Sequence, residues 1–513
     1  MKRLNKLLPV LIVLFVGAFF RFWHLNFGLP HSFYADEPEL MEPAIKYTYS
    51  IRNIVSDKNW HELIPISYVY GTFPTYFLTS AVMVFSKTLN VLNVSFDKTT
   101  LFLFQRSIFA FLGVLLILTC GNLYKSLNQS TLGYYLMLLL IALNWKFIVH
   151  SHYANHDILI TLLIIASFIF AHLYNTSGKT KDLLWMSLFL GLSVGTKITT
   201  IIALPLYIFL IFKKKDIWGI PGLIFVILLT FMITNPFSII FFNDFIERIF
   251  TMGVKEAGMV FDSVDYSPFK YISALSQMLT APIFLLGLVG MVKNLKKTAN
   301  KDFDIFMIMH VVLYLVFFSL QTRRVDRWLL PLLPIFIYYA ADLLQFIYFK
   351  FEHKTYVKIL FGLLFLYYVH NPILLLAQFQ RYTPKAQSFL WAQKTLPPES
   401  FKLVYTEEGL DPLNKLKNAK VVQYPVYTSS NAHLYFPEDP TKYSYVFVSS
   451  RPMENFKRKE VIENYPNYTK AWNDFENTLQ DATKFEVTKD FVLPKPNLIP
   501  LSDVAVYKRV NNP

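Results

Sequence analysis

Cysteine is almost absent from this sequence: Cys120 is the only one in 513 residues, and it lies within an apolar run. A single thiol excludes a disulfide framework within the chain and a metal site built on cysteines. Charged residues are also scarce, at 16% of the chain, against a hydrophobic fraction of 54% and a mean hydropathy of +0.37. A soluble globule cannot bury that much apolar surface, so the composition predicts a polytopic membrane protein.

Acidic residues are outnumbered 35 to 49 by lysines and arginines, which gives a net charge of +14. The basic residues occur in short clusters between apolar runs, as they do in cytoplasmic loops, so we expect no nucleic-acid partner. The first six residues, MKRLNK, resemble the basic start of a signal peptide. No small-residue cleavage site follows the apolar stretch, which indicates a retained first helix.

Apolar runs recur along the chain, and the positive-inside rule gives them a topology. We expect a multi-pass plasma-membrane protein that is mainly α, with about 11 spans (11–13) and a cytoplasmic N-terminus. The run at about 68–83 is rich in Tyr, Thr and Pro, and it fits a helix lying in the membrane interface better than a span. The predicted spans are about 7–23, 104–124, 131–149, 157–175, 182–197, 199–212, 217–234, 272–293, 303–320, 328–348 and 356–377.

The character of the sequence changes after residue 377. Residues 378–513 are polar, and short β-like runs at 401–405, 421–427, 443–448 and 504–507 alternate with a helical stretch near 470–485. This pattern predicts a small α/β domain, which an odd number of spans places outside the cell. Residues 1–377 then form the membrane module, with a large first outer loop at 24–103 and a second at 235–271.

Two adjacent carboxylates, Asp36 and Glu37, lie in the first outer loop, about a dozen residues beyond the first predicted span. Carboxylates at the rim of a membrane-buried body are costly unless they bind a cation or move a proton. The pair is therefore a candidate catalytic site. The alternative is an ordinary helix N-terminus, because Pro38 suits a first helical turn and Asp36 can cap it.

A third acid, Asp157, ends the segment His150-Ser-His-Tyr-Ala-Asn-His-Asp157 between two predicted spans. This loop lies on the same side as the Asp36 loop, so the two carboxylates can meet in space. Such a pair suits a divalent cation, Mg²⁺ or Mn²⁺, or a base and the group that orients it. The alternative is that the three histidines anchor the loop at headgroup depth and Asp157 caps the next helix.

The predicted topology places several basic residues on the outer side, against the positive-inside rule, and Arg106, Lys197, Arg324 and Arg327 are among them. A specific anionic partner explains them, and guanidinium groups match the oxygens of a phosphate. They are therefore candidate phosphate ligands. The alternative for the two arginines of the last outer loop is a local ion pair with Asp326.

Five motifs in order resemble the GT-C fold of membrane glycosyltransferases. The resemblance is to bacterial and archaeal relatives of the protein O-mannosyltransferases, glycosyltransferase family 39-like, and of the lipid A aminoarabinose transferase, and it covers about residues 7–377. The motifs are Arg21-Phe-Trp-His with Asp36-Glu37, the run 104–113 led by Arg106, the loop 151–157 that ends in Asp157, the Gly-rich turn 190–197 that ends in Lys197, and Arg327-Trp-Leu-Leu-Pro331.

The resemblance implies an inverting transfer of a sugar from a polyprenyl-phosphate donor to a lipid, glycan or protein acceptor on the outer membrane face. Asp36 would be the base that deprotonates the acceptor, or a ligand of a metal that helps it. Glu37 would orient Asp36 or share an ion with it, and Asp157 would assist with the acceptor. The leaving phosphate would be stabilised by Lys197, Arg324 and Arg327, with Arg106 as a weaker member.

Departures from the resemblance leave the sugar and the acceptor open. Where the aminoarabinose transferases carry a Glu before a Pro, this chain has Gly71-Thr72-Phe73-Pro74, and it lacks the Trp-Trp-Asp-Tyr-Gly signature of oligosaccharyltransferases. A competing function is a flippase or transporter of lipid-linked sugars, which also needs cations for phosphate. Candidates at the outer rim disfavour it, because transporters usually bind near the midplane. A non-catalytic scaffold would leave the outward acids and arginines unexplained.

Overall fold

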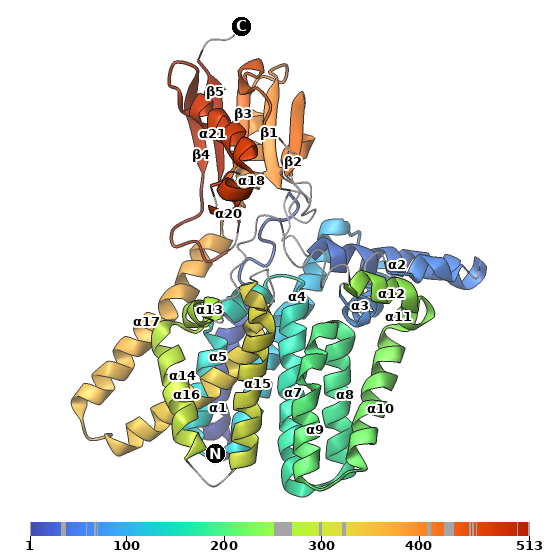
Figure 1. Ribbon diagram of the computed structural model, residues 1–513, viewed down its shortest axis with the longest axis vertical. Helices are drawn as coiled ribbons and strands as arrows, with labels where there is room; N and C mark the ends of the chain where they lie inside the picture. Colours follow the sequence, from blue (N-terminus) through green and yellow to red (C-terminus); the bar gives the residue numbers. More distant parts are fainter. Residues whose placement is uncertain are drawn as a thin grey trace.

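A bundle of long helices carries a small β-sheet at one end (Figure 1). We call the end of the bundle nearest the sheet the sheet end, and the opposite end, where the N-terminus lies, the far end. The computed structural model describes residues 2–31, 37–57, 59–65, 68, 70–250, 269–296, 300–320, 325–407, 412–424, 436–450, 453, 456–457, 459–499 and 501–510.

Each predicted apolar segment is helical. Within the described residues, five helices are long and apolar enough to cross a membrane: α4 (Lys98–Leu127), α7 (His156–Ser177), α15 (Lys301–Ser319), η4 with α16 (Asp326–Leu332 and Leu333–Lys350), and α17 with α18 (Thr355–Phe379 and Pro384–Thr395). Shorter apolar stretches lie in α1 (Lys2–Phe22), in η2 with α9 (Ile198–Ala203 and Leu204–Lys213) and in α10 (Gly219–Thr234). The helix α8 (Thr180–Thr196) packs between α7 and α10.

Two of the predicted spans, 131–149 and 272–293, are bent pairs of helices, which corrects the single straight helix expected for each. The angle is 53° between α5 (Thr131–Ala142) and α6 (Trp145–Ser151), and 108° between α13 (Lys270–Leu279) and α14 (Ala281–Leu295). The two breaks meet, because Asn144 Nδ2 donates to the carbonyl of Met278 at 3.0 Å and Trp145 Nε1 to that of Gln277 at 3.1 Å. Side-chain donors thus form hydrogen bonds with carbonyls that a helix break leaves without a helical partner. Such bonds are needed in a bilayer, because its core offers no water to replace them.

Arg21, near the end of α1, caps the break between α5 and α6. Its guanidinium is fully buried and donates to the carbonyls of Ile141 at 3.1 Å and Ala142 at 2.9 Å. Gly113 of α4 leaves the necessary space, since a Cβ there would lie 2.9 Å from Arg21 Nε and 2.2 Å from Ser151 Oγ. The arginine of the first motif is therefore a structural residue of the membrane bundle.

Several helices do not run along the bundle. Figure 1 shows α2 (Glu37–Asp57) lying across the sheet end, crosswise to α7 and α8, with α11 (Pro236–Ile240) and α12 (Phe242–Phe250) at the same level. α3 (Phe73–Val91) packs on α2 and is not among the helices apolar enough to span, as far as the chain is described. This agrees with the interface helix predicted for the run at 68–83.

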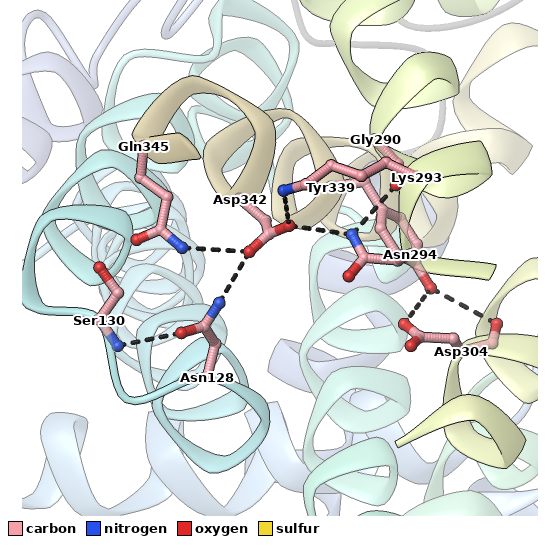
Figure 2. A network of polar contacts seen from close by, with 9 residues as sticks. All are labelled: Asn128, Ser130, Gly290, Lys293, Asn294, Asp304, Tyr339, Asp342 and Gln345. Carbon is pink, nitrogen blue, oxygen red and sulfur yellow. Dashed lines mark hydrogen bonds and ion pairs between the residues drawn. The ribbon is translucent and has the colours of Figure 1, made fainter. Parts of the chain in front are cut away.

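A polar network joins four helices at the far end of the bundle (Figure 2). Asp342 of α16, almost fully buried, accepts hydrogen bonds from Asn128 Nδ2 at 2.7 Å, from Gln345 Nε2 at 3.1 Å, and from Asn294 Nδ2 and Lys293 Nζ, both at 3.0 Å. Tyr339 of α16 donates to Asp304 of α15 at 2.9 Å. The network fixes α16 against α4, α14 and α15, so it also fixes η4 at the other end of the same span.

Replacing Asp342 by Leu is expected to lower the free energy of unfolding by about 3–5 kcal/mol, because the substitution leaves Lys293 without its carboxylate and three side-chain amides without this acceptor. Unfolding followed in detergent micelles measures the loss. The control is Asp302→Asn, because the Asp302 carboxylate is 49% exposed and pairs with Lys213 at 3.7 Å. Its loss should stay below about 1 kcal/mol. Equal losses in the two variants would contradict a stabilising role for the network.

The residues after α17 form a five-stranded sheet with the order β2-β1-β3-β5-β4. Its first three strands are parallel, and β5 joins β3 and β4 antiparallel. Apolar residues of β1 alternate between the two faces, so α18 covers Val404, and α21 (Pro466–Gln480) covers Leu403 and Tyr405. The strands are β1 (Lys402–Glu407), β2 (Ala419–Tyr424), β3 (Tyr445–Ser449), β4 (Phe485–Phe491) and β5 (Val504–Arg509); a short α20 (Lys459–Asn464) precedes α21.

The connection between β4 and β5 descends to the end of α17 (Figure 1). Gln378 of α17 is fully buried there, and its Nε2 donates to the carbonyls of Pro494 and Pro496, both at 2.8 Å. Leu493 and Ile499 of the connection are buried in the same apolar core as the membrane helices. The sheet is thus fastened to the sheet end of the bundle by packing and by hydrogen bonds.

Candidate functional site

Glu37, the first residue of α2, forms a buried ion pair with Arg106 of α4. Arg106 Nε donates to Glu37 Oε1 at 2.8 Å and Nη2 to Oε2 at 2.6 Å, and both side chains are essentially inaccessible. Arg106 Nη1 also donates to the carbonyls of Leu25 at 2.9 Å and Phe27 at 2.7 Å. A two-point pair of this kind holds a fixed geometry. It ties the start of α2, next to Asp36 in the chain, to α4 and to the segment that follows α1.

The same carboxylate reaches the second acidic loop. Glu37 Oε1 accepts a hydrogen bond from the backbone N–H of Ala154 at 3.0 Å. The loop that leads to Asp157 is therefore anchored on the Glu37–Arg106 pair. Arg106 is engaged in this pair and by two carbonyls, and its predicted contact with a phosphate stays a prediction.

Asp157 lies in the first turn of α7, and its side chain faces two cations. Lys197 Nζ is 3.9 Å from Asp157 Oδ1, and Arg327 Nε is 3.5 Å from Oδ2. The cap of α7 is supplied by Asn155, whose Oδ1 accepts from the Asp157 N–H at 2.7 Å. The carboxylate of Asp157 is thus available for the cations. Three separate sequence motifs meet at this point, from α7, from the end of α8 and from η4.

Lys197 is placed by a close backbone contact between the end of α8 and the first outer loop. The Gly71 N–H donates to the carbonyl of Thr196 at 3.0 Å, and a Cβ on Gly71 would lie 1.9 Å from the carbonyl oxygen of Gly195. Only glycine fits at such an approach. Thr72 N–H donates to Asn235 Oδ1 at 2.7 Å, which adds the end of α10 to the same junction.

Aromatic rings border the Lys197 ammonium. The ring centres of Tyr70 and Trp328 lie 5.7 Å and 5.3 Å from Nζ. Contacts of this kind attract a cation and hold it in a defined direction. Neither ring was among the predicted site residues. Tyr70 directly precedes Gly71 in the chain, and Trp328 directly follows Arg327.

The histidines of the second acidic segment are buried by protein groups. His152 stacks on Phe379 at 3.7 Å, and its ring nitrogens lie 3.0 Å and 2.7 Å from the carbonyl oxygens of Ile148 and Trp23. His156 stacks on Tyr70 at 4.2 Å. These contacts join the Asp157 loop to α17 and to the first outer loop.

Lys146, the second residue of α6, was also not among the predicted site residues. Its charge lies within electrostatic range of Asp157, Asp326 and Arg327. A signal was present, because no other Lys, Arg, Asp or Glu occurs between Lys125 and Asp157. An isolated charge in an apolar segment is itself an indication of function.

Two predicted residues, Asp36 and Arg324, lie outside the described residues, so their roles stay predictions. The described residues do not form a cluster of three or more His, Cys, Asp or Glu side chains that would hold a metal. Asp157, proposed as a ligand of Mg²⁺ or Mn²⁺, faces Lys197 and Arg327 instead. That environment suits an anion better than a divalent cation.

No protein-family model matches the chain, and no curated protein matches it. Solved structures do resemble it. ArnT from Cupriavidus metallidurans bound to undecaprenyl phosphate aligns with a TM-score of 0.51 at 11% identity, over 98% of this chain and 97% of its own. The oligosaccharyltransferase AglB from Archaeoglobus fulgidus, in complex with an inhibitory peptide and a dolichol-phosphate, aligns with a TM-score of 0.54 at 13% identity, over 91% of this chain and 72% of its own.

Both structures have the GT-C fold, and the alignments span the helical bundle together with the C-terminal sheet. The sequence prediction of that fold is therefore confirmed, including its mainly helical character and its small C-terminal sheet. Identities this low establish the architecture and leave the chemistry to the residues of the site. The chain is a polytopic membrane protein of the GT-C fold.

Proposed function

We propose that this protein is a membrane glycosyltransferase that moves a sugar from a polyprenyl-phosphate donor to a lipid, glycan or protein acceptor. The observation that carries the proposal is the group of Lys197 and Arg327 around Asp157 at one end of a GT-C bundle. The solved ArnT and AglB structures, with undecaprenyl phosphate and dolichol-phosphate, support the class of donor.

The reaction needs two kinds of group on opposite sides of the sugar. A hydroxyl or amide of the acceptor attacks the anomeric carbon, the bond from that carbon to the phosphate oxygen breaks, and the oxygen keeps the electron pair. A carboxylate that accepts the proton raises the reactivity of the acceptor. Cations that face the phosphate stabilise the charge that develops on it. Attack opposite to the leaving group inverts the anomeric configuration.

Lys197 and Arg327 have the charge and the placement for the phosphate side. Their side chains are 12% and 14% exposed, so their charges are only weakly screened by solvent. Asp157 holds both cations in place before the donor arrives. When a phosphate binds, its oxygens take over part of these contacts.

Asp36 is the proposed base on the acceptor side. The Glu37–Arg106 pair supports this assignment, because it fixes the residue that follows Asp36 in the chain. Glu37 itself has both oxygens engaged, by Arg106 and by the Ala154 N–H. It is therefore proposed to position Asp36 and not to accept a proton from the acceptor.

Substitution of the two cations tests the proposal. In proteoliposomes supplied with polyprenyl-phosphate sugars and candidate acceptors, the wild type should release polyprenyl phosphate together with glycosylated acceptor. Lys197→Met and Arg327→Met should each weaken the binding of polyprenyl phosphate by about 10- to 100-fold, because each removes a charge-assisted hydrogen bond. Binding of uncharged polyprenol should not change.

The matched control is Lys213→Met at the end of α9, where the side chain is 49% exposed. It should bind polyprenyl phosphate as the wild type does. Movement of intact lipid-linked sugar across the bilayer, without cleavage of the sugar–phosphate bond, would show a flippase and overturn the proposed transfer.

A further inference from the structure

Tyr70 of the first outer loop contacts two parts of the proposed phosphate site, which consists of Asp157, Lys197 and Arg327. Its ring stacks on the ring of His156, with the two centres 4.2 Å apart and an angle of 10° between the planes. The centre of the same ring lies 5.7 Å from Lys197 Nζ. His156 directly precedes Asp157, whose Oδ1 is 3.9 Å from that Nζ. Tyr70 therefore lies against the segment that carries the carboxylate and against the cation that faces it.

The backbone beside Tyr70 is fixed to the backbone beside Lys197. Gly71 follows Tyr70, and its N–H donates to the carbonyl of Thr196, the residue before Lys197, at 3.0 Å. A Cβ on Gly71 would lie 1.9 Å from the carbonyl oxygen of Gly195, so the loop and the end of α8 are in direct backbone contact. The ring and the ammonium are thus held at a set separation by the chain on both sides.

A second ring contacts the same ammonium from another element. Trp328 of η4 has its ring centre 5.3 Å from Lys197 Nζ, and it packs on the buried Phe318 of α15 at 5.1 Å. The Lys197 side chain is 12% exposed. A cation that is already partly dehydrated and held in one direction loses less hydration and less freedom when it binds an anion. The two rings therefore arrange Lys197 before a phosphate arrives.

We propose that Tyr70 is a positioning residue for the donor phosphate, and that its ring acts through Lys197 by holding the ammonium where the phosphate binds. This inference rests on the proposed function. It gives the first outer loop, which also carries the proposed base Asp36, a part in binding the donor. Tyr70 takes no proton in this role, and its hydroxyl is not required.

The test measures the Kd of polyprenyl phosphate with the full-length protein in proteoliposomes. Tyr70→Leu removes the ring and should weaken binding by about 3- to 10-fold, the size of a partly desolvated contact between a cation and a ring. Tyr70→Phe keeps the ring and should retain most of the affinity. Binding of uncharged polyprenol should not change. The matched control is Tyr49→Leu, because Tyr49 belongs to the same outer loop and is 56% exposed on α2.

A double substitution shows whether Tyr70 acts through Lys197. In the Lys197→Met background the ring has no ammonium to hold, so Tyr70→Leu should change the Kd of polyprenyl phosphate by less than about twofold. A ring that only supports the fold would weaken binding by the same factor in both backgrounds. Tyr70→Gln, which also lacks a ring, is the second variant should Tyr70→Leu fail to fold, and unfolding in detergent micelles establishes the folded fraction of each variant.

The outcomes separate this inference from the proposed function. If Lys197→Met weakens polyprenyl phosphate binding and Tyr70→Leu does not, the inference is wrong and the phosphate site stands. If neither Lys197→Met nor Arg327→Met weakens it, the proposed function falls as well. Three results would each overturn the positioning role alone: an equal effect of Tyr70→Leu with and without Lys197, an equal effect on polyprenol, or a loss in Tyr70→Phe as large as in Tyr70→Leu.

Discussion

Replacing Asp36 by Asn is expected to lower the rate of sugar transfer by about 10²- to 10⁴-fold, the usual contribution of a positioned general base. The substitution keeps the size of the side chain and removes its ability to take a proton from the acceptor. The measurement is kcat with a polyprenyl-phosphate sugar in proteoliposomes, together with the binding of polyprenyl phosphate. Binding should be retained, because the cations that face the phosphate come from α8 and η4.

The control for this substitution lies at the end of α2. Asp57, the last residue of α2, is exposed and accepts a hydrogen bond from Ser56 Oγ at 2.9 Å. Asp57→Asn should leave the transfer rate unchanged. Full activity in Asp36→Asn would remove Asp36 from the mechanism. Chelation with EDTA separates the two roles open to Asp36, since a base works without a divalent ion and a metal ligand does not.

Replacing Glu37 by Gln is expected to cost about 3–5 kcal/mol of stability, because the fully buried guanidinium of Arg106 would lose its counter-charge. The pair joins α2, α4 and the Ala154 backbone, so the loss reaches both acidic loops. Unfolding in detergent micelles measures the stability. Transfer activity per folded molecule should fall, but less than in Asp36→Asn, because Glu37 positions Asp36 and takes no proton itself.

A double substitution tests this assignment further. Glu37→Met with Arg106→Met removes both charges, so its loss of stability should be smaller than the sum of the two single losses by at least about 1 kcal/mol. Additive losses would show that the two charges do not depend on each other. If the activity per folded molecule of Glu37→Gln is as low as that of Asp36→Asn, Glu37 has a chemical role and the positioning role is wrong.

The adjacent acids Asp36 and Glu37 show how far sequence reasoning reaches at the site. The pair was marked by its position alone, and that signal does not distinguish two neighbouring carboxylates. In the structure Glu37 forms an ion pair with the buried Arg106. We therefore propose that Arg106 positions Glu37, in place of the phosphate contact predicted from the sequence. Which acid pairs with which base depends on contacts between residues 69 positions apart in the chain, and a local pattern cannot show those contacts.

Lys146 is a residue that the local sequence pattern did not single out. In the sequence it is one charge within an apolar segment that was predicted as a straight span, and a charge near a span end is ordinary by snorkelling. The break between α5 and α6 brings its charge within electrostatic range of Asp157 instead. That break depends on caps from other elements, such as Arg21 of α1 and the Met278 carbonyl of α13. None of these partners is near Lys146 in sequence.

The β-sheet was predicted with one strand missing. The four expected strands are rich in Val, Tyr and Phe, whereas β4 (Phe485–Phe491) has Glu, Thr, Lys and Asp between its apolar ends and lies at the edge of the sheet. An edge strand pairs on one side only and tolerates charged residues. β4 forms because it pairs with β5, and this pairing belongs to the tertiary structure and cannot be seen in the local sequence.

Composition and the spacing of apolar runs by themselves determined that this is a polytopic membrane protein with helices in the stated segments, because burial in lipid demands long apolar stretches. The order of its polar motifs was enough to predict the GT-C fold. Only the tertiary structure decided which charges meet: Glu37 with Arg106, and Asp157 with Lys197 and Arg327. Electrostatic interactions fall off with distance in space, so they follow the packing of helices and not the order of residues.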